Sequence, residues 1–281
     1  SIIGNVINFC LNAFFLFVLH KGVAGVATAT VISRIINLVI VVLLGAVLVK
    51  AKQHPERESN RAVMGQIIRI GLPSACETAI YNVSMTLVIR FLNQMDAQGL
   101  NVTARSYTMQ ITNFSYCVGA ALAQANAIMT GWHIGAKEYD ACDRGTKKAA
   151  VIGVIVAVIL ETVFTLCSGW IMQLFSKDPQ MVSLVGKLLA IDIVLEIGRV
   201  TNLVYGQALK TSGDAVFPVV MGACFMILCS VGGTYLFGIR LGLLAVGAYI
   251  GMTGDECVRA VGMYLRWKSG KWKEKGLVKS R

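Results

Sequence analysis

The chain has 281 residues, of which 56% are apolar and only 15% are charged. Soluble domains usually carry about 25% charged residues, so the composition excludes an ordinary soluble domain and indicates a membrane protein. The net charge of +11 would suggest nucleic-acid binding in a soluble protein. Here most basic residues lie in the segments between apolar runs, so we expect the lipid bilayer and no nucleic acid as partner.

Eight apolar runs along the chain are each long enough to cross a bilayer, which requires about 20 residues in a helix. They predict an all-α membrane protein with about eight transmembrane helices. In chain order, the runs lie near residues 2–19, 23–49, 73–95, 104–131, 149–174, 183–208, 215–237 and 241–265.

A polar linker, residues 50–72, separates the second run from the third. It ends in an amphipathic stretch, which we expect to lie at the membrane interface as an elbow helix. The linker divides the chain into the last two helices of an N-terminal lobe, residues 1–49, and a six-helix C-terminal lobe, residues 73–267. A basic tail, residues 268–281, follows.

The basic residues are concentrated after the second, fourth, sixth and eighth runs. Cytoplasmic loops of membrane proteins carry an excess of Lys and Arg. We therefore expect these connections and the C-terminus to be cytoplasmic.

Several charged side chains lie inside the apolar runs, where each costs at least a few kcal/mol unless it has a partner, a water-filled cavity or a function. One interpretation is a cation or proton site, and the alternative is a tolerated charge or an intrahelical ion pair such as Glu196 with Arg199. Glu77 has Tyr81 and Ser84 on the same helix face, Glu161 lies in the fifth run, and the sixth run carries Asp192, Glu196, Arg199 and Asn202 as one stripe.

Uncharged polar stripes occur in two further runs. The first run contains Asn8 and Asn12, and the fourth contains Gln110 and Asn113. Such stripes either line a cavity or hold helices together by hydrogen bonds.

Enzyme motifs are not found in the sequence, which has no HExxH, GxSxG or P-loop pattern. An intramembrane hydrolase would need a nucleophile or metal set of that kind. We therefore expect a non-enzymatic protein without cofactor or structural metal.

Several segments in order resemble the multidrug and toxic compound extrusion (MATE) family. Asn8 and Asn12 followed by Gly22, Gly25 and Thr30 resemble the fifth and sixth helices of that family. Arg69–Pro73 with Glu77 resembles the start of the family's seventh helix. Leu209–Pro218 resembles the turn between its tenth and eleventh helices, and Asp255–Trp272 resembles its C-terminal end.

The resemblance implies a partial N-lobe and a complete C-lobe, helices five to twelve of a twelve-helix protein whose first four helices are missing from this chain. It implies a coupling role for Glu77 and for Asn8, Asn12 and Thr30, which would bind the coupling Na⁺ or H⁺. Two departures from the family pattern leave the choice of ion open: residue 12 is Asn where several relatives have Asp, and Arg199 stands where some sodium-coupled members carry an acid.

Together these features predict a prokaryotic inner-membrane antiporter, monomeric as a full-length protein. It would export organic, cationic or amphiphilic solutes in exchange for Na⁺ or H⁺ by alternating access. A lipid-linked oligosaccharide flippase and a non-transporting scaffold are the alternatives. The expected coupling residues are Glu77, Asn8, Asn12, Thr30, Glu196 and Asp192, and the expected cavity residues are Tyr81, Ser84, Gln110, Asn113, Arg199 and Asn202.

Overall fold

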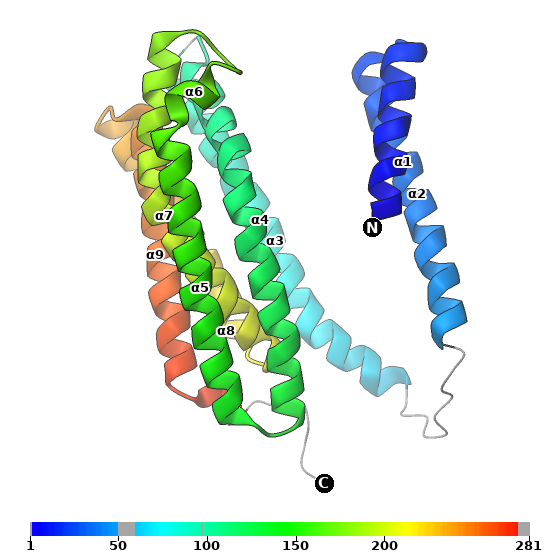
Figure 1. Ribbon diagram of the computed structural model, residues 1–281. Helices are drawn as coiled ribbons and strands as arrows, with labels where there is room; N and C mark the ends of the chain where they lie inside the picture. Colours follow the sequence, from blue (N-terminus) through cyan, green and yellow to red (C-terminus); the bar gives the residue numbers. More distant parts are fainter. Residues whose placement is uncertain (1, 50–59, 97, 275–281) are drawn as a thin grey trace. The chain divides into compact units, whose positions relative to one another are not determined.

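The computed structural model describes residues 2–49, 60–96 and 98–274, and in these ranges the chain is helical without strands (Figure 1). The chain divides into two compact units, Ser1–Val63 and Met64–Arg281, which we call the N-terminal and C-terminal units. Each is described by itself.

The N-terminal unit holds two of the predicted spans. The first is α1, Ile2–Ala13, continued by the π-helical turn η1, Phe14–Val18, and the second is α2, Gly22–Val49. The two helices pack side by side (Figure 1). Gly25 permits this approach, since a Cβ there would lie 2.9 Å from the Cβ of Lys21 and 3.1 Å from that of Phe15.

The C-terminal unit contains the other six spans. These are α3, Asn60–Met95; α4, Leu100–Gly135; α5, Tyr139–Leu166; α7, Pro179–Thr211; the composite helix of α8, Val216–Phe225, η2, Met226–Val231, and η3, Thr234–Arg240; and α9, Leu244–Lys268. Two short helices, α6 (Ser168–Met172) and η4 (Lys271–Glu274), complete the unit. The eight spans expected from the apolar runs are thus present.

Three helical segments in the described part of the chain are both long and apolar enough to cross a membrane by composition: Gly22–Gly45, Tyr139–Leu166 and Val216–Arg240. The helices α4, α7 and α9 are of similar or greater length but carry more polar residues. Those residues gather inside the C-terminal unit, as described below.

Helix α7 is the central element of the C-terminal unit, packing against α4, α5 and α9 (Figure 1). Its first turn is fixed by Asp178, whose carboxylate accepts a hydrogen bond from the Gln180 amide at 3.0 Å, with Pro179 at the first helical position. At Gly198, α7 approaches α9 so closely that a Cβ would lie 2.9 Å from the backbone nitrogen of Cys257. This contact brings the polar stripe of α7 against the polar residues of α9.

The amphipathic stretch of the linker is helical. Helix α3 begins at Asn60 and continues to Met95, so the stretch expected as an interfacial elbow helix is continuous with the third span. Residues 50–59 of the linker lie outside the described residues.

The first part of the expected basic tail is also structured. Trp272 in η4 is buried and stacks on Trp267, with ring centroids 4.2 Å apart. Its indole NH donates to the Trp267 carbonyl at 3.0 Å, while the Trp267 indole donates to Asp143 at 2.9 Å. The end of α9 is therefore fastened to α5. Residues 275–281 of the tail lie outside the described residues.

Candidate functional site

Two adjoining cavities lie inside the C-terminal unit. The smaller, of about 210 Å³, is lined by side chains that include Arg105, Asp192 and Tyr249. The larger, of about 590 Å³, is lined by side chains that include Glu77, Asn202 and Lys210. Five residues line both cavities: Tyr81, Tyr116, Arg199, Glu256 and Arg259.

A cluster of ion pairs forms the boundary between the cavities. Arg199 of α7 pairs with Glu196 on its own helix and lies 3.6 Å from Glu256 of α9. Arg259 binds Asp255 through two hydrogen bonds of 2.9 Å and Glu256 at 3.0 Å. Each carboxylate and guanidinium here has an opposite charge beside it, which is the condition for burying charges in a low dielectric.

Neutral polar groups complete this cluster. Ser230 donates to Asp255 at 3.0 Å, and Asn202 donates to Glu256 at 3.0 Å. The cluster therefore connects three helices: α7, α9 and the composite helix made of α8, η2 and η3.

In the larger cavity, Glu77 of α3 accepts a 2.6 Å hydrogen bond from the Lys210 ammonium of α7. Both side chains are 20% exposed. The sequence suggested Tyr81 as the neighbour of Glu77, whereas the structure supplies a cation from a helix 133 positions away. A solute cation or a coupling ion would have to compete with Lys210 for this carboxylate.

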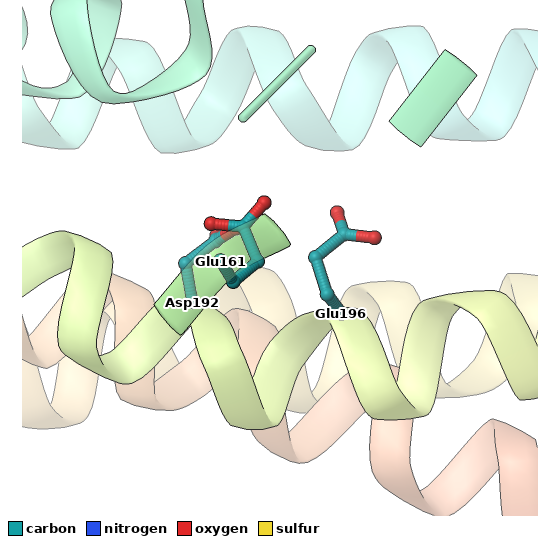
Figure 2. A group of neighbouring side chains, drawn as sticks. All are labelled: Glu161, Asp192 and Glu196. Carbon is teal, nitrogen blue, oxygen red and sulfur yellow. The ribbon is translucent and has the colours of Figure 1, made fainter. Parts of the chain in front are cut away.

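A second group of acids is buried between α5 and α7. Glu161, Asp192 and Glu196, which we call the acid triad, have ligand oxygens within 4.8 Å of one another. Figure 2 shows their carboxylates pointing to the same side. Oxygens bound to one hard cation at 2.3–2.6 Å lie within roughly 5 Å of each other, so the spacing fits a single cation.

The acid triad has unmet hydrogen-bonding capacity. One oxygen each of Asp192 and Glu196 is buried without a hydrogen-bond partner among the described residues, and the buried Glu161 carboxylate has only the Ser115 hydroxyl near it there as a hydrogen-bond donor. Arg199 compensates Glu196. Since buried polar groups are nearly always partnered, this arrangement favours a bound cation or protons.

In the N-terminal unit the predicted coupling residues are partly together. Asn12 donates to Asn8 at 3.0 Å, and Asn8 donates to Ser33 of α2 at 3.2 Å. The side-chain amide oxygen (Oδ1) of Asn12 is buried without a hydrogen-bond partner within the described residues. Thr30 instead bonds to the Val26 carbonyl of its own helix and is exposed on this unit.

The predicted cavity residues separate into two groups. Tyr81, Asn113, Arg199 and Asn202 line the cavities of the C-terminal unit. Ser84 is buried, Gln110 is exposed, and the lining of the two cavities includes neither of them.

Site residues that the sequence reasoning missed are Asp255, Glu256 and Arg259 in the eighth span and Lys210 at the end of the sixth. The first three belong to the segment that resembles the C-terminal end of the MATE family. The rule applied to Glu77, a charge within an apolar run, would have identified them as site residues. Lys210 had no such signal, because it lies after the run and was interpreted through topology.

Buried charges that line cavities in membrane-spanning helices are typical of solute and ion pathways. The MatE family model matches residues 73–236, and the chain belongs to this family.

Relatives of the chain are named as transporters. The chain is 33% identical over 280 residues to the uncharacterized transporter YisQ of Bacillus subtilis, covering 98% of this chain and 61% of YisQ. It is 22% identical to the human multidrug and toxin extrusion protein 2, covering 90% of this chain and 42% of that protein. The chain thus spans about three fifths of YisQ and less than half of the human protein.

The fold is shared with solved structures. The crystal structure of the eukaryotic MATE transporter AtDTX14 matches with a TM-score of 0.86 at 18% identity, over 98% of this chain and 62% of that one. The expected MATE-like helical fold is confirmed.

Proposed function

We propose that the protein is a secondary active antiporter that exports organic, cationic or amphiphilic solutes in exchange for Na⁺ or H⁺. The observation that carries this proposal is the acid triad, three buried carboxylates of which only Glu196 has a cation bound to it among the described residues. Such a group is costly in a bilayer, and binding of a cation or protons would offset that cost. The names of the relatives, which include multidrug and toxin extrusion proteins, support efflux as the direction of transport.

Coupling follows from differential affinity. If the coupling ion binds better to one conformation and the solute to the other, each shifts the equilibrium toward its own state. Glu77 is suited to this exchange because Lys210 holds its carboxylate at 2.6 Å until another cation replaces the ammonium. Asp192 and Glu196 would act with Glu161 in the acid triad.

Asn8 and Asn12 would supply neutral oxygen ligands in the N-terminal unit. The unpartnered Asn12 oxygen is of the carbonyl type that binds Na⁺ in transporters. Thr30 would join only if its hydroxyl left the Val26 carbonyl.

The proposal includes a prokaryotic plasma membrane, a cytoplasmic C-terminus by the positive-inside rule, a monomeric full-length protein and no catalytic activity. Alternating access between two lobes would expose the solute site to each side in turn. A flippase for lipid-linked oligosaccharides would need a cationic cavity for pyrophosphate, whereas the cationic side chains at the boundary cluster are paired with acids.

The test is efflux by the full-length protein in proteoliposomes, driven separately by a Na⁺ gradient and by a pH gradient. We expect Glu77→Gln to lower ion-driven efflux by about tenfold or more, since a charge-assisted interaction of about 1.5–3 kcal/mol is lost. The matched control is Glu138→Gln, whose side chain is 59% exposed and bonds only to His133 within the described residues.

Undiminished ion-driven efflux by Glu77→Gln would remove the coupling role of Glu77. A non-transporting scaffold would give a different result. The unaltered protein would show no gradient-driven efflux, and changing Glu77, Asp192 and Glu196 together would alter its stability alone.

A further inference from the structure

Arg105 is a buried cation that forms no ion pair with an acid in the described part of the chain. It lies in the second turn of α4, is 7% exposed and lines the smaller cavity. Its one hydrogen bond in the described part of the chain is a 3.6 Å contact with the Met85 thioether, and its Nε has no partner there. A thioether is a weak acceptor, so the guanidinium has most of its donors unused.

The other arginines of this cavity differ. Arg199 and Arg259 each lie beside two carboxylates, so their charges are compensated within the protein. Burying an uncompensated charge costs several kcal/mol, and side chains of this kind are retained where a ligand completes them. Arg105 therefore points to an anionic group that comes from outside the chain.

We propose that Arg105 binds the carboxylate of an organic solute held in the smaller cavity. A guanidinium presents a planar fork of donors that matches a carboxylate with two parallel hydrogen bonds. This inference rests on the proposed transport function and adds an acidic group to the solutes it covers.

The rest of the smaller cavity suits such a solute. Tyr81, Tyr116 and Tyr249, with Met109 and Met252, offer aromatic and flexible apolar contacts for an organic body. The volume of about 210 Å³ is below the roughly 300–1,000 Å³ typical of drug-sized pockets. A small aromatic acid, or the acidic end of a larger solute, is the ligand that fits.

Asp192 lines the same cavity and keeps one buried carboxylate oxygen without a hydrogen-bond partner in the described residues. A solute with both an ammonium and a carboxylate would satisfy Asp192 and Arg105 together. The cationic solutes of the proposed function would use the first of these contacts alone.

The experiment measures binding to the purified full-length protein in detergent, with benzoate as the probe and benzamide as its uncharged counterpart. Arg105→Gln should weaken benzoate binding by about tenfold or more, because a charge-assisted bidentate pair is lost, and leave benzamide binding unchanged. Arg105→Lys keeps the charge without the fork and should fall between. The matched control is Arg144→Gln, an exposed arginine near the start of α5, which should bind both probes as the unaltered protein does.

If Arg105→Gln binds neither benzoate nor benzamide, a second measurement on another variant tests the proposal. Arg105→Met removes the uncompensated charge, so the ligand-free variant should melt at a higher temperature than the unaltered protein. A lower melting temperature would assign Arg105 a purely structural role and overturn the proposal.

Other outcomes also contradict it. Equal weakening of benzoate and benzamide binding by Arg105→Gln would show that Arg105 does not recognise the carboxylate charge of the probe. Stronger binding of inorganic pyrophosphate than of benzoate would favour a flippase-type ligand. Ion-driven efflux of a cationic solute that survives Arg105→Gln leaves the proposed function intact in either case, so the two failures are distinguishable.

Discussion

Two groups of buried acids in the C-terminal unit have opposite surroundings. Asp255 and Glu256 of α9 are bound by Arg259 at 2.9–3.0 Å. In the acid triad between α5 and α7, Glu196 alone has an ion pair among the described residues, with Arg199. Both groups are acids inside membrane-spanning helices, and all of them except the half-buried Glu256 are buried, so burial alone does not separate them.

The difference teaches that partners, more than burial, separate a structural charge from a candidate binding site. A compensated cluster holds helices together and is lost at a cost in stability. Buried acids without a bound cation, such as Glu161 and Asp192 among the described residues, are costly in the folded protein and are expected to be used by a ligand. Two substitutions test this contrast, and a third, at the half-buried Asp96 outside both groups, provides a comparison.

Arg259→Gln should have the largest effect. It leaves Asp255 and Glu256 buried without their main cation, and breaking a buried pair in this way lowers the free energy of unfolding by about 3–5 kcal/mol. Thermal or denaturant unfolding of the full-length protein in detergent measures it. Adding Asp255→Asn should recover part of the loss, whereas a fall below about 1 kcal/mol would show that the cluster is solvated like a surface pair.

Glu161→Met should have the opposite sign. It replaces a buried carboxylate that has no ion pair in the described part of the chain with an apolar side chain of similar length, and relief of the burial penalty is expected to raise the free energy of unfolding by about 1–3 kcal/mol. The same variant should lose the dependence of efflux on its coupling ion. A destabilised variant with normal coupling would place Glu161 with the structural charges.

Asp96→Asn should have the smallest effect and a dependence on pH. Asp96 precedes α4 and accepts hydrogen bonds from the Leu100 and Asn101 amides, both at 3.0 Å. Burial alone would raise the pKa of Asp96, but the hydrogen bonds from Asn101, Leu100 and Gly99 lower it from its ordinary value of 3.8.

Because the folded pKa is depressed, the stabilisation by Asp96 is fully present above pH 3.8 and is lost as the pH falls through the folded value. At neutral pH the Asn variant should therefore be less stable by about 1 kcal/mol, because a hydrogen bond to a charged acceptor contributes about 1.5–3 kcal/mol and one to a neutral acceptor about 0.5–1.5 kcal/mol. Unfolding at a series of pH values measures the difference, which should shrink in acid. A difference independent of pH would mean that the amide and not the charge is what matters.

The sequence predicted the features that depend on neighbours along one helix. Apolar runs of about 20 residues gave the eight spans, and the three-residue spacing of Glu196 and Arg199 gave an ion pair that the structure contains. The segments that resemble the MATE family were sufficient to place the chain in it.

Features that depend on contacts between helices were not predictable in this way. Lys210 meets Glu77 from 133 positions away, and Glu161 joins Asp192 and Glu196 only because α5 packs on α7. Arg105 and Arg259 carry the same charge in the sequence. In the structure Arg259 lies beside two carboxylates, whereas Arg105 contacts a thioether.

The sequence by itself therefore determined that the chain is helical, spans the membrane and belongs to a family of transporters, because apolar length and helical spacing act over a few turns. Only the tertiary structure decided which buried charges are compensated. That depends on which helix faces meet, and close contacts such as the one at Gly198 fix this between segments far apart in the chain.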